Sequence, residues 1–499
     1  MKIFFINPPF KSAYGKFSRE SRSPAVTKSG ALYYPLWLIY AAAYAEKQGF
    51  LVKFLDAPAE QMNEATSLEY VKAHGKDTRL FVLDTSTPSI YSDIRFGEKL
   101  KDIYPDAFVL LVGTHPSATP EETLAYNTKI DGVARREYDI TVSKLAKVLE
   151  EGGDLSTVQG LSYRKKLENK KSNKDAASSV ICHNPDQPYL EDLDEIPMAA
   201  AFIKEHLNYK NYFFAAAEYP EIQIFTGRGC PCMCNFCVYP QTMHGHKYRL
   251  RTPENVVAEF RYIREHFPDV KEVVIEDDTF TISKERVKAI CDLLIKEGLN
   301  KRFKWLCNAR VNTLDLATMQ LMKKAGCRLI IPGIESGNQK ILDNIKKGTN
   351  LQQIHAYIQN AKRAGLLVHA CYMVGNEGET KETMEETLRL ALKLNTDTAQ
   401  FFPLIPYPGT EAYAWAKKNH YLAGGYDDYC KEDGTHNCVL NLPGLSGKEM
   451  VDFCDEARRR YYLRPRYILH RLYVGLKDPA DLKRSLKAFS KIKKYLFKK

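Results

Sequence analysis

The chain has 499 residues, of which 44% are hydrophobic and 27% are charged. This length allows two or three domains with a large core, and this composition excludes an intrinsically disordered chain. The net charge of +11 is uneven, because residues 458–499 contain 15 Lys or Arg and 2 Asp or Glu, whereas residues 1–457 contain 57 and 59. A body so close to neutral argues against a nucleic-acid channel through it, and nucleic acid is not an expected partner.

Neither a membrane span nor a secretory signal is predicted. The longest apolar run, LYYPLWLIYAAAYA from Leu32, is too short for a span and contains Pro35, so we interpret it as a buried helix. The first residues, MKIFFINPPF, lack the charged start, apolar core and cleavage site of a secretory signal. We therefore expect a cytoplasmic protein with reduced thiols, in which twelve cysteines do not form a disulfide framework.

Residues 1–152 alternate between strand-like and helix-like segments. KIFFIN, LVKFLDA, LFVLDTS and FVLLVGTH are apolar runs typical of buried strands, and helical patterns such as PLWLIYAAAYAEKQG separate them. This alternation predicts an α/β domain with a doubly wound, Rossmann-like parallel sheet. Ligands of such sheets bind at the carboxyl ends of the strands. The residues expected at that edge are Asn7, Asp84, Thr85, Gly113 and His115.

Three further regions follow. Residues 153–215 contain the polar stretch RKKLENKKSNKDAASS and the proline-containing NPDQPYLEDLDEIP, which predict a loop within a linker. In residues 216–410 the alternation restarts with six strand–helix steps, fewer than the eight of a closed barrel, and predicts a partial (β/α)6 barrel of the TIM type. Residues 411–499 are predicted to form a helical C-terminal region that ends in a basic tail.

The stretch GRGCPCMCNFCVYP, residues 227–240, holds four of the cysteines. Cys230, Cys234 and Cys237 are spaced C-x3-C-x2-C, and three thiolates on one loop can bind a 4Fe–4S cluster while leaving one iron open to another molecule. Structural zinc would need a second pair of ligands further along the chain. His244 and His246 are near but fit that pattern poorly, and Cys232 is interpreted as a loop thiol outside the triad.

These motifs resemble a known family. The strand IQIFTGRG, followed by the cysteine triad with an aromatic residue before its third member, resembles the radical S-adenosylmethionine (SAM) enzymes. The 1–152 sheet, with NPP after its first strand and VGTHPSATPEET later, resembles the cobalamin-binding-type domain that precedes the barrel in one subclass. The resemblance implies that the triad binds the cluster, that SAM chelates its open iron, and that one electron cleaves SAM to a 5′-deoxyadenosyl radical.

The resemblance also implies that the enzyme binds cobalamin. It does not choose between methyl transfer, cyclisation and oxidation as the reaction. The pattern D-x-H-x-x-G, which supplies a histidine ligand to cobalt in other cobalamin proteins, is absent from residues 1–150. Base-off binding without a protein ligand is therefore expected. His115 lies at the expected edge, but a lone histidine there is more often a polar loop residue.

The resemblance places five further residues close to the cluster and to SAM. Phe236 would shield the cluster and Tyr239 would reach the adenine. Asp277 or Asp278 would face the methionine amine, although EDD here replaces the commoner GGE. Arg310 would pair with the methionine carboxylate. Packing or surface ion pairs are the alternative interpretations.

Three more positions are assigned to the nucleoside by the same resemblance. Glu335 and Ser336, in PGIESG, would contact the ribose. Gly375, in MVGNEGET, would allow the backbone to approach the adenine, and a plain strand-to-loop turn is the alternative.

The basic tail has a helical pattern of its own. From Leu482 onwards, apolar residues fall at 482, 486, 489, 492 and 496 with lysines on the opposite face. Such a helix can lie on an anionic membrane surface, and a solvated helix docked on the barrel is the alternative.

The sequence thus predicts a radical SAM enzyme that cleaves SAM reductively and functionalises an unactivated carbon of a small-molecule or lipid-like substrate. A flavodoxin or ferredoxin would supply the electron, and the enzyme would be cytoplasmic, with peripheral membrane contact through its tail. The alternative is a non-catalytic iron–sulfur or zinc protein that senses redox state or binds a partner through the tail.

Overall fold

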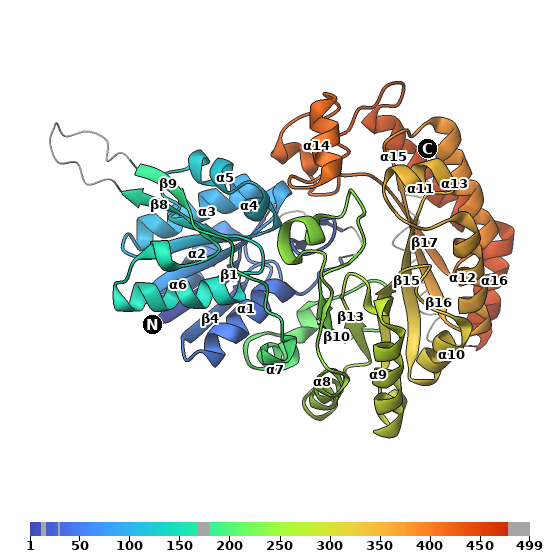
Figure 1. Ribbon diagram of the computed structural model, residues 1–499, viewed down its shortest axis with the longest axis horizontal. Helices are drawn as coiled ribbons and strands as arrows, with labels where there is room; N and C mark the ends of the chain where they lie inside the picture. Colours follow the sequence, from blue (N-terminus) through green and yellow to red (C-terminus); the bar gives the residue numbers. More distant parts are fainter. Residues whose placement is uncertain (11–15, 28–29, 167–178, 478–499) are drawn as a thin grey trace.

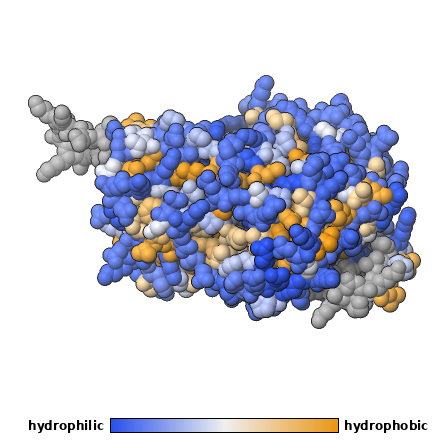
Figure 2. All heavy atoms as spheres, turned by 60° about the horizontal axis from the view of Figure 1, so that its bottom comes forward, coloured by the Kyte–Doolittle hydropathy of each residue, from blue (hydrophilic) through white to orange (hydrophobic). Residues whose placement is uncertain are grey.

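Two α/β units lie side by side in the computed structural model, which describes residues 1–10, 16–27, 30–166 and 179–477 (Figure 1). The N-terminal unit is coloured blue to cyan, and the second unit is coloured green to orange. The face drawn in Figure 2 is mainly hydrophilic, with hydrophobic residues gathered in separate patches. Within the described ranges, we find no helix with the length and apolar character that crossing a membrane requires.

The N-terminal unit has the predicted doubly wound parallel sheet. Its strand order is β4-β1-β5-β6-β7, with all four of these pairings parallel. The strands are β1 (Lys2–Asn7), β4 (Leu51–Asp56), β5 (Thr78–Thr85), β6 (Phe108–Gly113) and β7 (Gly132–Ala134). The helices between them are α1 (Leu36–Lys47), α2 (Glu64–His74), α3 (Ile90–Ile103), α4 (Thr114–Ala118) and α5 (Pro120–Tyr126), and α6 (Asp139–Glu151) follows β7. The interpretation of the apolar run at Leu32 as a buried helix is confirmed by α1.

The structure corrects the predicted linker over residues 153–215. Strands β8 (Leu161–Lys166) and β9 (Ser179–His183) extend the N-terminal sheet in antiparallel fashion beyond β7, and α7 (Ala199–His206) follows them. The side chains of β9 are half-buried or exposed, as at a sheet edge, so the hydrophobic alternation that reveals a strand is weak there. Most of the predicted loop, residues 167–178, lies outside the described residues.

The second unit is the predicted partial barrel. Six strands pair in parallel in the order β10-β13-β14-β15-β16-β17. They are β10 (Glu221–Ile224), β13 (Glu272–Ile275), β14 (Lys304–Ala309), β15 (Cys327–Glu335), β16 (Leu367–Val374) and β17 (Thr398–Pro403). The helices between them are α8 (Pro253–His266), α9 (Lys284–Lys296), α10 (Leu316–Lys324), α11 (Gln339–Asn344), α12 (Leu351–Arg363) and α13 (Lys381–Leu394).

The C-terminal region touches both units. Its helices are α14 (Glu411–Lys418), α15 (Gly447–Tyr462) and α16 (Pro465–Lys477). The hydroxyl of Tyr462 donates to the carbonyl of Ala399 on β17 at 2.7 Å, which fixes α15 on the barrel. The segment before α15 reaches the N-terminal unit, where Val26 N donates to the carbonyl of Gly434 at 2.8 Å. The tail helix predicted from residue 482 lies outside the described residues.

A buried ionic network joins the two units beside the cysteine loop. Arg228, on the short strand β11 (Gly227–Arg228), donates to both oxygens of Asp139 at 2.8 and 3.1 Å. Arg249, on the partner strand β12 (Arg249–Leu250), donates to Glu137 at 2.9 Å. The four side chains are at most 6% exposed. Because both carboxylates belong to the N-terminal unit, this network fixes the start of the cysteine loop against that unit.

We expect the substitution Asp139→Ala to lower the free energy of unfolding by about 3–5 kcal/mol, because it leaves the guanidinium of Arg228 buried without its main partner. Unfolding in urea measures this change. Asp452→Ala is the matched control, since Asp452 pairs with Lys448 at 2.6 Å on an exposed helix face. Its expected cost is within about 1 kcal/mol. Equal effects of the two substitutions would contradict the importance of the buried network.

Candidate active site

The three triad cysteines lie on one compact loop between β11 and the π-helical turn η6 (Pro240–His244). Gly229 has a φ of +91°, and a Cβ there would lie 2.0 Å from the carbonyl oxygen of Lys247, so only glycine fits the turn. The side-chain amide of Gln241 donates to the carbonyls of Cys234, at 3.3 Å, and Cys237, at 2.8 Å. These bonds hold the second and third cysteines of the triad on one turn.

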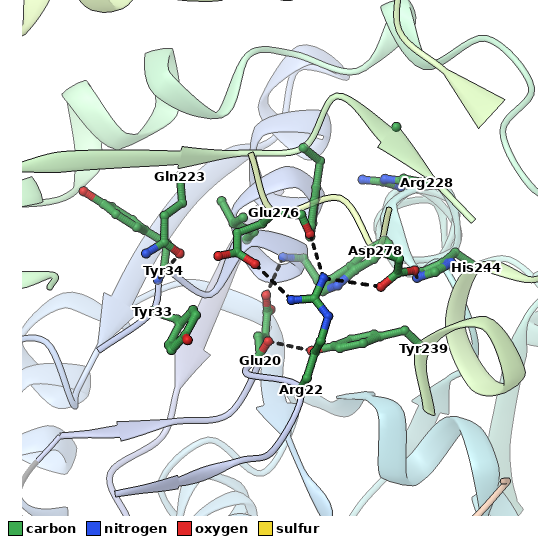
Figure 3. Close-up of a pocket in the computed structure, with 14 residues that line it drawn as sticks. Glu20, Arg22, Tyr33, Tyr34, Gln223, Arg228, Tyr239, His244, Glu276 and Asp278 are labelled. Atoms are coloured by element: carbon green, nitrogen blue, oxygen red, sulfur yellow. Dashed lines mark hydrogen bonds and ion pairs between the residues drawn. The ribbon is translucent and has the colours of Figure 1, made fainter. Parts of the chain in front are cut away.

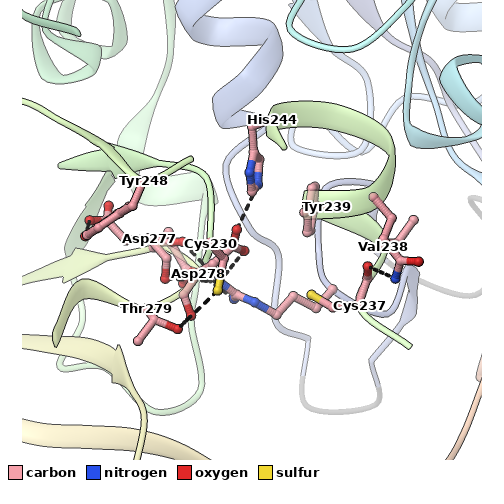
Figure 4. Close-up of polar contacts among 12 residues, drawn as sticks. Cys230, Cys237, Val238, Tyr239, His244, Tyr248, Asp277, Asp278 and Thr279 are labelled. Atoms are coloured by element: carbon pink, nitrogen blue, oxygen red, sulfur yellow. Dashed lines mark hydrogen bonds and ion pairs between the residues drawn. The ribbon is translucent and has the colours of Figure 1, made fainter. Parts of the chain in front are cut away.

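All four cysteines of the loop are free thiols, and Cys230 and Cys234 are buried. The sulfur of Cys230 lies 3.9 Å from Thr279 Oγ1 (Figure 4). The sulfur of Cys234 lies 3.8 Å from Arg310 Nη1. Hydrogen bonding to the Cys230 thiol lowers the pKa of Cys232, so these two thiols are neighbours. Cys232 is therefore left out of the triad because it does not fit the C-x3-C-x2-C spacing, and not because its thiol lies far from the others.

The donor set fits a cluster better than a zinc ion. Among the described residues, no three His, Cys, Asp or Glu side chains are grouped to hold a single metal ion. Each thiolate that binds a 4Fe–4S cluster is attached to a different iron, so the side chains need not converge on one metal ion. His244 Nε2 pairs with Asp278 at 2.8 Å, and His246 Nδ1 lies 3.1 Å from the carbonyl of Cys230. One ring nitrogen of each histidine therefore has a protein partner, while His244 Nδ1 is buried without one among the described residues.

The two predicted aspartates after β13 have different surroundings. Asp277 is buried and accepts hydrogen bonds from Thr226 N and Oγ1, both at 2.6 Å, so it ties β13 to the end of β10. Asp278 pairs with His244 and lies 3.6 Å from Arg22 Nη2. Burial alone would raise the pKa of Asp278, but His244 and Arg22 lower it overall. Asp278 is therefore the ionised carboxylate at the mouth of the barrel.

Arg22 and Glu20 reach this mouth from the hairpin of β2 (Phe17–Ser18) and β3 (Ala25–Val26), and no sequence motif marked them. Arg22 Nη1 pairs with Glu276 at 3.2 Å, and Nη2 donates to the carbonyl of Asp277 at the same distance. The Tyr239 hydroxyl donates to the carbonyl of Glu20 at 2.6 Å. Residues of both units line a cavity of about 30 Å³ here, with room for roughly two water molecules (Figure 3).

The remaining predicted residues lie at the ends of β15 and β16. Glu335 has a φ of +65°, and its Oε1 lies 2.7 Å from Lys347 Nζ. The Ser336 hydroxyl accepts from Asn338 N at 3.1 Å and shapes the turn that follows. Gly375 has a φ of +89°, and a Cβ there would lie 2.5 Å from the sulfur of Met450. Ser336 and Gly375 therefore have local packing roles, and their contacts with SAM stay predictions.

The predicted ligand edge of the N-terminal sheet also lies close to this mouth. Asp84 Oδ2 is buried without a hydrogen-bond partner among the described residues, and burial raises the pKa of this carboxyl. The nearby hydroxyl of Tyr138 is also buried and without a partner in that part of the chain. His115 is buried, and burial lowers its pKa to about 3, so it is neutral. Buried polar atoms normally have hydrogen-bond partners. The unpaired atoms at this edge therefore fit a large cofactor whose amide groups could bond to them.

Comparisons with known proteins agree with this geometry. Residues 224–391 match the model of the radical SAM superfamily, and residues 22–146 match that of the B12 binding domain. The chain is 30% identical to an uncharacterized methyltransferase, PH0819, of Pyrococcus horikoshii over 95% of both chains. The chain belongs to the radical SAM superfamily. The enzyme therefore uses a 4Fe–4S cluster, SAM and cobalamin, and the alternative of a non-catalytic sensor or zinc protein is set aside.

Two further matches describe the enzyme's relatives. It is 27% identical to the anaerobic magnesium-protoporphyrin IX monomethyl ester cyclase of Rubrivivax gelatinosus, over 83% of this chain and 69% of the cyclase. Its fold is similar to that of the cobalamin-dependent SAM radical enzyme OxsB, with a TM-score of 0.70 and 14% identity over 98% of this chain and 72% of OxsB. The predicted order of a sheet domain followed by a partial barrel is thus confirmed.

We expect Cys230→Ala, Cys234→Ala and Cys237→Ala each to abolish the bound cluster, because each removes one of only three thiolate ligands. Cys232→Ala is the matched control on the same loop and should keep it. Iron content and the visible absorption of anaerobically purified protein measure the outcome, and 5′-deoxyadenosine release from SAM should follow the same order. Loss of the cluster in Cys232→Ala would place this thiol in the ligand set instead.

Proposed function

We propose that the enzyme transfers a methyl group to an unactivated carbon of a small, lipid-like molecule. The supporting observation is that the cysteine loop and the polar edge of the N-terminal sheet flank one interface, where Tyr239 meets Glu20. Methyl transfer is favoured because the relative that matches over 95% of its length is named a methyltransferase. Cyclisation is the second candidate, because another relative is named a cyclase.

Bound at this interface, the cluster and SAM supply one-electron cleavage of a sulfonium, and cobalamin supplies a methyl carrier. We assign Cys230, Cys234 and Cys237 to the cluster. Arg310 is assigned to the methionine carboxylate, since its guanidinium already lies beside Cys234. Asp278, ionised at the barrel mouth, is assigned to the methionine amine.

Other side chains shape the site around these groups. Tyr239 is buried, with its ring parallel to that of His244 at 6.0 Å between centroids, and it excludes water between the two units. Phe236 shields the cluster from solvent. Glu335 and Ser336 are assigned to the ribose and Gly375 to the adenine, while Asp277 holds the ends of β10 and β13 together.

A low-potential electron donor, a flavodoxin or a ferredoxin, would dock where the cysteine loop meets the surface. The side chain of Met233, between Cys232 and Cys234, is 52% exposed, so the loop reaches solvent there. A donor seated on this tip would come close to the cluster without entering the barrel.

Helix α16 supports a membrane contact on the cytoplasmic face. Five of its large apolar side chains are exposed, and they recur at helical spacing on one face: Ile468, Leu469, Leu472, Tyr473 and Leu476. This face belongs to the region with 15 Lys or Arg against 2 Asp or Glu, so its charge is complementary to an anionic leaflet. A lipid-like substrate would then be drawn from the membrane on which the enzyme rests.

Methyl transfer is tested with the anaerobic holoenzyme, a reductant, and SAM that carries a labelled methyl group. Lipid extracts from cells that lack the gene serve as substrate. We expect 5′-deoxyadenosine, and the label in a lipid-soluble product one methylene heavier than its precursor. Release of 5′-deoxyadenosine with an unlabelled new product would favour cyclisation or oxidation instead. Labelling confined to water-soluble compounds would contradict a lipid-like substrate.

The double substitution Leu472→Glu and Leu476→Glu should weaken binding to anionic liposomes about tenfold or more, because two apolar side chains no longer enter the interface. Leu51→Glu is the matched control, since Leu51 is 70% exposed on the N-terminal unit. Liposome flotation measures binding, and added salt should weaken it in the unaltered enzyme. Equal binding by the double variant and the control would exclude α16 as the contact.

A further inference from the structure

The turn that follows α11 packs against the cysteine loop, and neither the motif nor the assigned roles above explain it. Asn235, inside the triad, donates from its backbone N–H to the carbonyl of Ile345 at 3.2 Å. Its side-chain amide donates to the carbonyl of Asn344, also at 3.2 Å. The cysteine loop is therefore held on this side by residues 344–348, which come from a different part of the barrel.

Lys347 is the residue of this turn that points into the barrel. Its side chain is only 8% exposed, and its Nζ lies 2.7 Å from Glu335 Oε1. The pair fits because residue 333 is glycine. A Cβ on Gly333 would lie 2.2 Å from Glu335 Oε1 and 2.9 Å from Lys347 Nζ. The chain thus leaves space for a buried ion pair at the end of β15, and such a pair is costly unless it is well matched.

The ammonium of Lys347 also faces the cysteine loop. Its Nζ lies 5.9 Å from the centre of the Phe236 ring, at the outer limit of a cation–π contact. The carboxylate of Glu335, 2.7 Å away, favours the charged form of this ammonium. Arg310 lies on the same side, with Nη1 3.8 Å from the Cys234 sulfur. The Lys347 ammonium therefore lies beside Phe236 of the cysteine loop, and the Arg310 guanidinium lies beside Cys234.

We propose that Lys347 is a positioning residue that raises the reduction potential of the cluster bound by the triad. Reduction adds a negative charge to a group already bound by three thiolates. A buried ammonium next to the cysteine loop stabilises that added charge more than solvent would. The negative charge of Glu335 partly offsets the effect of the ammonium, so the reduction potential depends on the charges of both residues. The inference rests on the proposed assignment of Cys230, Cys234 and Cys237 to the cluster.

The test is an EPR-monitored redox titration of the anaerobic holoenzyme without SAM, together with its iron content. Lys347→Met keeps the length of the side chain and removes its charge, and we expect a lower midpoint potential. Lys346→Met is the matched control, because Lys346 is the next residue in the chain, its side chain is 53% exposed, and it pairs with Glu411 on the surface. This control should leave the midpoint unchanged.

Two further variants separate charge from structure. Glu335→Gln should shift the midpoint in the opposite direction, to higher potential, because the ammonium loses its neutralising partner. Lys347→Arg should stay close to the unaltered enzyme. A purely structural role would not give opposite signs for the two members of the pair. These two variants distinguish an effect of charge from an effect of structure even if Lys347→Met binds less iron than the unaltered enzyme.

The proposal is overturned if Lys347→Met and Glu335→Gln shift the midpoint in the same direction, or if neither differs from Lys346→Met. This outcome is distinguishable from a failure of the proposed function, because the titration needs neither SAM nor substrate. An unaltered enzyme with a normal midpoint but no methylated product would contradict the function alone. Absence of a cluster from the unaltered enzyme would contradict the ligand assignment itself.

Discussion

The buried pairing of Arg228 with Asp139, and of Arg249 with Glu137, is the constraint on which the rest of the site depends. The two arginines flank the cysteine loop along the chain, and the two carboxylates belong to the N-terminal unit. Ionised groups without water must keep all their partners, so the network allows little sliding between the units. The cysteine loop is therefore fixed to the cobalamin-binding domain as well as to its own barrel.

The hairpin of β2 and β3 depends on that fixed arrangement. Arg19, at its start, pairs with Asp93 of the N-terminal unit at 2.6 Å, whereas Arg22, three residues later, pairs with Glu276 of the barrel at 3.2 Å. One short turn can form ion pairs with both units only if the distance between the units stays constant. The cavity beside it, of about 30 Å³, is lined by residues of both units.

Periodicity and spacing predicted much of this structure, because they are local properties of the chain. The parallel strands of both sheets and the triad of Cys230, Cys234 and Cys237 could be recognised from neighbouring residues alone. Arg22, Lys347 and Glu137 could not, because their roles come from partners far away in the sequence. The same limit explains β9, whose half-exposed edge position leaves no clear alternation to read.

Charge pairing also distinguishes the three cations around the mouth of the barrel. Arg22 is matched by Glu276 and Asp278, and Lys347 by Glu335. The guanidinium of Arg310 is different, because among the described residues no carboxylate lies within ion-pair distance of it, and it contacts only the sulfur of Cys234. A buried cation without an anion is costly in an empty site and favourable in one that receives a carboxylate. This contrast supports the assignment of Arg310 to the methionine carboxylate of SAM, which stays a prediction.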